Sequence, residues 1–346
     1  MPKKKRYVAP CDAATRAMAL GGDDSSLLLA QCWDCFEPMP PAGADDWLGD
    51  GNPGERDRMG QSVKRFLRPG PHRTFPMRSA CKVYLCPLGD VSAAPPPKVL
   101  CDLIQRWLTL EVVVLKPGIS TKEFLELPRC EEECGYGPQL ETPTVHELCH
   151  RHKPRDAFAV VAYTMADICD TENGFGFLFG QAQLDKGVGV FSFARYRDDA
   201  PPAALFLRRC GMVLAHECLH LFGIAHCVYG KCIMNGSNHL GESESRPFAL
   251  CPVDVRKLSA TINDARLPSG LFDAVGRERG MLEWFEKHGL HSDAVFTRRC
   301  LASLGHPVPP PAEAALGLEA LASKEGGAAS HAPVSEATAA NTFAPG

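Results

Sequence analysis

Apolar positions through the middle of the chain follow two spacings, one typical of strands and one typical of helices. Short apolar or β-branched runs predict strands, and apolar residues three and four positions apart predict amphipathic helices. The predicted strands cover residues 82–85, 111–115, 158–163 and 188–194. The predicted helices cover residues 97–110, 144–153, 203–221, 252–262 and 270–287. Strands that alternate with helices indicate an α/β fold with a helical C-terminal part.

Two of the predicted strands differ in their side chains. Residues 158–163 are apolar throughout, as expected for a strand that is buried on both faces. Residues 188–194 alternate Val and Ser with small or aromatic residues, which favours a strand at the edge of the sheet. An extended peptide can bind along such an edge through backbone hydrogen bonds.

Both ends of the chain lack this periodicity. Residues 1–75 are rich in Gly, Pro, Asp and Arg, and we expect a poorly ordered N-terminal region there. The C-terminal residues are dominated by Ala, Gly, Ser, Pro and Glu, so we expect residues 301–346 to form a low-complexity disordered tail. Residues 76–300 then form one folded domain, which is long enough to bury a core.

The charge balance and the N-terminus exclude several function classes. The 346 residues carry a net charge of −4 with a sequence pI of about 6.3, so the chain is not built to condense on nucleic acid or on an anionic membrane. No apolar run is long enough to predict a membrane span, and none follows the N-terminus as a secretory signal would require. We therefore expect an intracellular, cytoplasmic protein whose 16 cysteines do not form a disulfide framework.

The basic run Pro2-Lys3-Lys4-Lys5-Arg6 leaves a nuclear location open. The run matches a short nuclear-import signal, and it is equally typical of a solvated charged terminus. Nucleic-acid binding is not expected in either case, because no second basic segment accompanies the run. The sequence does not determine the oligomeric state.

One segment combines residues that can hold a catalytic metal. His216 and His220 are four positions apart, so on a helix both imidazoles lie on the same face and can share one zinc ion. Glu217 lies beside them, where its carboxylate can reach a metal-bound water without binding the metal. Gly223 permits the sharp turn that ends the helix and returns His226 as a third ligand. Three protein ligands leave the fourth position to water, which is typical of a catalytic zinc.

The same short motif occurs a second time without its supporting residues. His146-Glu147-Leu148-Cys149-His150 also reads HExxH, but the Gly and the third His that follow the first motif are missing. Pro154 ends any helix four residues later. We therefore interpret this second copy as accidental. The lone Cys32-Trp33-Asp34-Cys35 is likewise not expected to bind metal, because structural zinc sites need four ligands.

The long motif resembles one metallopeptidase family. The pattern HExxHxxGxxH followed by Cys227, Cys232 and Met234 resembles the archaemetzincin (archaelysin) family. The continuing stretches 236–240, 246–247, 250–252 and 256–258 resemble the eukaryotic branch of that family. This resemblance implies a metzincin-like twisted mixed sheet with an active-site helix for the catalytic domain at residues 76–300. It also implies that Met234 packs beneath the zinc site.

The resemblance further implies a second, structural zinc bound by Cys227, Cys232 and Cys251. The family's fourth ligand is a cysteine, and this chain has Asp254 in its place. A carboxylate oxygen can bind zinc, although sulfur is the better-matched donor. His239 or water could instead complete the shell, or the second zinc could be lost and leave three buried thiols.

These observations predict a zinc-dependent peptidase that acts on peptides, with short peptides favoured by the resemblance. Zinc would activate a water and polarise the scissile carbonyl, and Glu217 would serve as general base. The alternative is a catalytically silent, zinc-stabilised binding protein, which the missing fourth cysteine and the long terminal segments favour. The retained Glu217 argues against that alternative, because a scaffold does not need it.

Overall fold

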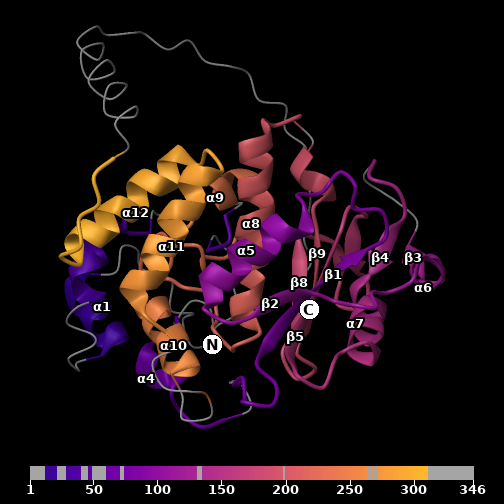
Figure 1. The fold of residues 1–346 in the computed structure, drawn as a ribbon, viewed down its shortest axis with the longest axis horizontal. Helices are drawn as coiled ribbons and strands as arrows, with labels where there is room; N and C mark the ends of the chain where they lie inside the picture. Colours follow the sequence, from indigo (N-terminus) through magenta and orange to yellow (C-terminus); the bar gives the residue numbers. More distant parts are fainter. Residues whose placement is uncertain are drawn as a thin grey trace, which may run out of the picture.

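The computed structural model describes residues 12–21, 29–39, 46–48, 60–70, 74–130, 135–197, 199–263, 267 and 272–310 (Figure 1). The basic run at residues 2–6 and the tail from residue 311 lie outside these described residues. The prediction of three regions, with boundaries at residues 75 and 300, stays a prediction. Among the described residues, no helix is both long and apolar enough to cross a membrane.

A mixed five-stranded sheet forms the centre of the molecule. Its order is β2-β1-β5-β9-β8, and the first four strands are parallel while β8 runs antiparallel to β9. The strands are β1 (Lys82–Leu88), β2 (Val112–Val114), β5 (Ala157–Thr164), β8 (Gly180–Gln183) and β9 (Val188–Ser192). The prediction of an α/β fold with a mixed sheet is confirmed.

The prediction of the edge strand is wrong. β9 is hydrogen-bonded on both sides, to β5 and to β8, and all five of its residues are buried. Within the described part of the chain, the two edges of the sheet are β2 and β8, and β8 pairs only with β9. The residues of β8, Gly-Gln-Ala-Gln, include no β-branched or aromatic side chain, and they therefore gave no strand signal.

Helices cover the two faces of the sheet in the way that strand alternation requires. Val161 and Tyr163 of β5 belong to the larger core, together with α5 (Pro97–Leu108) and the active-site helix α8 (Ala203–His220). Val160 and Ala162 belong to a smaller core with α7 (Thr142–Arg151) on the other face. The sequence predicted all three helices and the doubly buried character of β5.

A second, four-stranded sheet lies beside α7, in the order β3-β4-β6-β7. Its strands have two to four residues each, too few for a recognisable alternation in the sequence. They are β3 (Arg129–Cys130), β4 (Gln139–Glu141), β6 (Ile168–Asp170) and β7 (Phe175–Leu178), with the short helix α6 (Thr121–Leu125) before them. The Gly, Pro and acidic residues at positions 117–143 are typical of loops, but α6, β3 and β4 lie within this segment.

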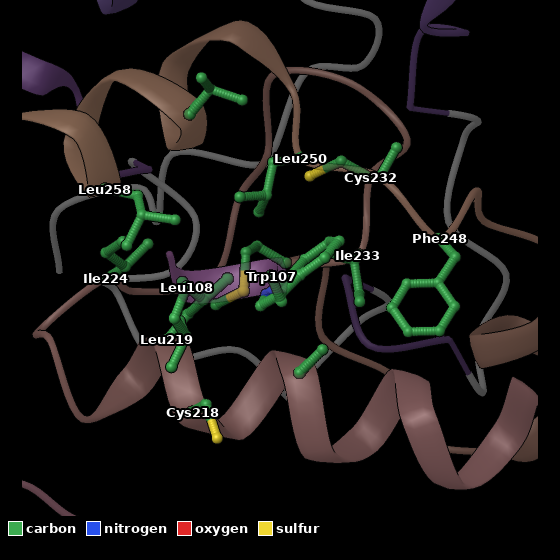
Figure 2. Close-up of a cluster of buried hydrophobic side chains, with 14 of the residues drawn as sticks. Trp107, Leu108, Cys218, Leu219, Ile224, Cys232, Ile233, Phe248, Leu250 and Leu258 are labelled. Atoms are coloured by element: carbon green, nitrogen blue, oxygen red, sulfur yellow. The ribbon is translucent and has the colours of Figure 1, made fainter. Parts of the chain in front are cut away.

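The helical C-terminal part packs on the side of α5 and α8 away from the sheet (Figure 1). It consists of α9 (Leu240–Glu244), α10 (Pro252–Ile262), α11 (Ala274–Lys287) and α12 (His291–Ser303). Figure 2 shows how Leu108 of α5, Leu219 of α8 and Leu258 of α10 meet in one buried cluster with residues of the loop between them. The packing fixes α8 between the sheet and the C-terminal helices.

Described parts of the N-terminal region also belong to the larger core. They form α1 (Ala13–Leu20), the 3₁₀ helix η1 (Gln31–Cys35) and α4 (Val63–Phe66). A further 3₁₀ helix, η2 (Ala194–Arg197), lies outside this region and precedes α8. Trp33, Trp47 and Phe66 are at most 9% exposed. α1 and α4 contact α10, and η1 contacts α12. These segments therefore join the C-terminal helices to the rest of the fold.

Candidate metal centre and catalytic residues

The helix α8 brings His216 and His220 together as their spacing predicts. Their Nε2 atoms are 3.0 Å apart, and their ring centroids are 4.6 Å apart. The ring of His226 lies 5.3 Å from that of His216 and 4.9 Å from that of His220. Each of the three imidazoles offers one ring nitrogen, and these three nitrogens all lie within 4.8 Å of one another.

Backbone carbonyls orient the first two imidazoles. Nδ1 of His216 is 2.7 Å from the carbonyl of Ile233, and Nδ1 of His220 is 2.7 Å from the carbonyl of Ile224. A carbonyl only accepts, so each Nδ1 must carry the proton and donate it. Burial, together with the neighbouring His220 and His226, lowers the pKa of His216 well below its ordinary value. The Nε2 atoms face one another at 3.0 Å, an arrangement that a shared cation stabilises.

A glycine turn places the third imidazole. Gly223 has φ = 81°, a left-handed conformation that a side chain disfavours, and its N–H bonds to the carbonyl of His220 at 2.8 Å. Gln61 bridges the turn, because its amide donates to the carbonyl of Gly223 at 3.0 Å and accepts from the N–H of Ala225 at 3.0 Å. Gln61 could not be predicted from the sequence, because nothing in its local pattern reports a contact 162 residues away.

Glu217 lies beneath the edge strand of the sheet. A Cβ built on Gly180 of β8 would come within 3.2 Å of Cγ of Glu217. Burial raises the pKa of Glu217 to about 8, although the charge of Arg246 acts in the opposite direction. A carboxyl group with a raised pKa beside a cluster of imidazoles is typical of a catalytic site.

Hydrogen bonds hold the loop that follows the Gly223 turn next to the histidine group. Met234 is fully buried, and its carbonyl accepts a hydrogen bond from the N–H of Cys227 at 2.7 Å. The side chain of Asn235 donates to the carbonyls of Cys227 and Gly230 and accepts from the N–H of Cys232. The loop is thereby fixed next to Ile233, whose carbonyl orients His216.

A second group of potential metal ligands lies directly behind this loop. Cys227, Cys232, Cys251 and Asp254 are all buried, and their ligand atoms all lie within 4.8 Å of one another. The Sγ atoms of Cys227 and Cys251 are 3.6 Å apart. Oδ2 of Asp254 is 3.6 Å from Sγ of Cys232 and 3.3 Å from Sγ of Cys251. The structure thus brings together the four residues that were predicted to bind a second zinc.

The two oxygens of Asp254 have different partners. Oδ1 accepts a hydrogen bond from Nζ of Lys257 at 2.8 Å, and both side chains are fully buried. Oδ2 faces the sulfurs. Burial and the neighbouring Cys227 raise the pKa of Asp254 to about 6, against the effect of Lys257. Burial also raises the pKa of Cys232 and of Cys251.

Cys227 differs from the other two thiols. Burial acts to raise its pKa, but contacts with Cys232 and Cys251 and the charge of Lys257 bring the pKa well below its ordinary value. Three buried cysteines beside a carboxyl group are a donor set that suits a divalent zinc ion.

His239 does not take part in this second group. It lies with Asp46 and Glu242 in another cluster, where its Nε2 is 3.2 Å from Oδ1 of Asp46. The alternative in which His239 completes the shell is therefore wrong.

The second HExxH sequence forms no metal group among the residues that the structure describes. Nε2 of His146 lies 2.9 Å from the backbone carbonyl of Gln181, in the edge strand β8. Glu147 forms an ion pair with Lys186, and His150 is exposed. These residues support the edge strand and a surface contact, which agrees with the interpretation that the motif match is accidental.

Comparisons with known proteins point to one family. Residues 149–260 match peptidase family M54. Archaemetzincin-2 of Macaca fascicularis is 27% identical over 290 residues, which cover 73% of this chain and 75% of that protein. Archaemetzincin-2 of Pongo abelii is 26% identical over 318 residues, or 81% of this chain and 83% of that protein.

Solved structures of similar chains cover about half of this one. Archaemetzincin (AmzA) from Archaeoglobus fulgidus is 24% identical and covers 51% of this chain and 99% of its own, with a TM-score of 0.40. A zinc-dependent peptidase from Methanocorpusculum labreanum is 20% identical with the same coverage and a TM-score of 0.41.

The family match and the curated relatives confirm the resemblance of the HExxHxxGxxH motif and its following residues to archaemetzincins. Residues 149–260 thus match a peptidase family M54 domain, and together with the similarity to archaemetzincins this match indicates a zinc metallopeptidase.

Proposed function

We propose that this zinc metallopeptidase hydrolyses short peptides, with a zinc ion held by His216, His220 and His226 and with Glu217 as general base. The observation that carries the proposal is the pair of imidazoles whose Nε2 atoms face each other at 3.0 Å while both Nδ1 atoms donate to carbonyls. Bound zinc would supply Lewis-acid activation of water and of the scissile carbonyl.

Glu217 moves the protons of the reaction. Its carboxylate accepts a proton from the attacking water and then delivers that proton to the leaving amine. The burial that raises the pKa of Glu217 to about 8 favours the protonated form needed in the second step. The charge of Arg246 favours the carboxylate needed in the first step. General acid–base catalysis of this kind contributes about 10²–10⁴-fold to the rate.

The edge strand β8 binds the substrate in this proposal. An extended peptide can add to its free side through backbone hydrogen bonds. Three contacts hold β8 at Gln181. The backbone carbonyl meets His146, Oε1 accepts from Thr142, and Nε2 donates to Asp170 at 2.7 Å. Gly180 lets the strand pass close to Glu217, so the bound peptide lies next to the general base.

A second, structural zinc is bound by Cys227, Cys232, Cys251 and Asp254 in this proposal. Lys257 takes one carboxylate oxygen of Asp254 and leaves the other directed at the three sulfurs. This cluster adjoins the loop that orients His216, so metal bound there would stabilise the geometry of the catalytic centre.

The replacement Glu217→Gln tests the proposal. We expect this variant to keep its zinc, measured by elemental mass spectrometry, and to lose cleavage of a mixture of short synthetic peptides, measured by mass spectrometry. Glu147→Gln is the matched control, because Glu147 occupies the same place in the second HExxH sequence and contacts Lys186 at the surface. It should cleave at the wild-type rate.

Two results would speak against the proposal. Undiminished cleavage by Glu217→Gln would remove Glu217 from the mechanism. A wild-type chain that binds zinc and peptides without cleaving any of them would support the catalytically silent binding protein instead.

A further inference from the structure

Trp47 packs against the third imidazole of the metal centre. The rings of Trp47 and His226 meet edge to face, with centroids 5.0 Å apart and an interplanar angle of 74°. Trp47 is 6% exposed, although it lies 179 positions from His226 in the sequence. A buried indole in this position covers one side of a residue that the metal centre requires.

His226 differs from the other two histidines in the backbone that carries it. His216 and His220 belong to α8, and a backbone carbonyl fixes the Nδ1 of each. His226 follows the Gly223 turn in an irregular stretch without helix or strand. Its ring orientation therefore depends on side-chain packing more than on secondary structure.

The segment that carries Trp47 is anchored to α9 and to the loop that precedes it after Met234. The backbone N–H of Trp47 donates to both carboxylate oxygens of Glu242, at 3.0 and 3.2 Å. Glu242 also accepts the N–H of Asn238 at 2.8 Å. Asp46 is 3.2 Å from Nε2 of His239. Residues 46–48 are thus attached to the same loop that begins at the metal centre.

Gly236 forms the other side of the space that holds the indole. A Cβ at Gly236 would lie 2.4 Å from Cδ2 and 2.5 Å from Nε1 of Trp47. The backbone of Gly236 has no positive φ, so Ala fits there without backbone strain. The substitution would therefore disturb the contact between the indole and the loop at Gly236.

We propose that Trp47 is a positioning residue for the third metal ligand, and that residues 46–48 complete the metal centre from the N-terminal region. The inference rests on the proposed function in that His226 must bind the zinc. Trp47 restricts the rotation of the His226 ring and excludes water from its side, so the metal meets a preorganised ligand.

The experiment follows the release of zinc to a chelator in excess and the visible spectrum of the Co²⁺-substituted chain. The phase that belongs to the histidine site is the one that is lost in His226→Ala. Trp47→Ala should release zinc from this site about tenfold faster, in line with the usual cost of removing a residue that orients a ligand. Its Co²⁺ bands should also shift, because the ligand field changes when His226 reorients.

Three further variants make the result interpretable. Gly236→Ala should reproduce the fast release although Trp47 is still present, and Trp47→Phe should restore most of the slow release because an aromatic edge remains. Trp33→Ala is the fold control. Trp33 is also a buried indole of the N-terminal region, but it packs on Phe36 and Arg16. Its release rate and Co²⁺ bands should match the wild type.

The outcomes separate the two proposals. If His226→Ala leaves the zinc content and the release rate unchanged, the assignment of the metal ligands is wrong. If His226→Ala loses the zinc but Trp47→Ala and Gly236→Ala release it at the wild-type rate, the ligand assignment holds and the role of Trp47 is refuted. Equal acceleration in Trp33→Ala would also refute it, by showing a general effect on the fold.

Discussion

Replacing Lys257 by Met should destabilise the chain by an amount that depends on zinc. Lys257 and Asp254 form an ion pair in which both side chains are fully buried and Nζ lies 2.8 Å from Oδ1. Removing one partner of such a pair leaves an uncompensated buried charge, at a cost of about 3–5 kcal/mol. If zinc binds Oδ2 of Asp254, the metal compensates that charge. The cost of Lys257→Met then falls to about 1 kcal/mol, the usual net value of one hydrogen bond.

Urea unfolding followed by circular dichroism measures this difference. The background should carry His216→Ala and His220→Ala, so that only the cysteine cluster can respond to metal. With a denaturant slope of about 2 kcal/mol/M, Lys257→Met should lower the midpoint by about 2 M in chelator and by about 0.5 M in zinc. Lys231→Met is the control, because Lys231 pairs with the exposed Glu37 at 2.9 Å and such surface pairs contribute about 0–1 kcal/mol.

Two outcomes would refute this reasoning. An equal loss of stability with and without zinc would mean that Asp254 does not bind the metal. A loss below about 1 kcal/mol in chelator would mean that the buried pair itself contributes little.

Three further predictions concern the edge strand and a surface helix. Gln181→Ala should raise KM for peptide hydrolysis several-fold with little change in kcat, because β8 loses its side-chain contacts with Thr142 and Asp170 while the general base is untouched. Steady-state kinetics measures both constants, and an equal fall in kcat would contradict this prediction. Gly180→Ala should lower kcat, since the new Cβ would crowd Phe191 and lie 3.2 Å from Glu217, whereas an unchanged kcat would mean that the strand can move away. Hydrogen bonds from Ser120 hold the pKa of Glu123 at about 2, below its usual 4.5, so its contribution to stability is present above about pH 4.5 and is lost as the pH falls toward 2. The acid unfolding of Glu123→Gln should accordingly be less steep between pH 4.5 and 2 than that of the wild type, and identical curves would contradict the assignment.

The active-site helix could be predicted from sequence because its signals are local. Apolar spacing, a Pro at its start and Gly223 at its end all fall within about twenty residues, and the metal-binding spacing is built on the same helix. The same holds for β5, whose apolar run is long enough to be recognised. The four residues of the cysteine group were nominated through the resemblance, and the packing of α10 against the loop brings them together.

What could not be predicted depends on contacts between distant segments. β8 is a strand because β9 pairs with it, and its own residues have no strand preference. Gln61 and Trp47 reach the proposed metal centre from a region rich in Gly and Pro, where composition indicated little order. The pairing of Asp254 with Lys257 could not be predicted either, because a lysine on a helix is usually solvated and the sequence does not show that Lys257 is buried.

The zinc content of the purified chain after exhaustive dialysis tests the account most directly. Elemental mass spectrometry should find two zinc ions per chain, one of which disappears in His216→Ala/His220→Ala and the other in Cys227→Ser/Cys251→Ser. Peptide cleavage should be abolished in the histidine variant. A wild-type chain that retains no zinc, or a histidine variant that keeps both its zinc and its cleavage activity, would contradict the account.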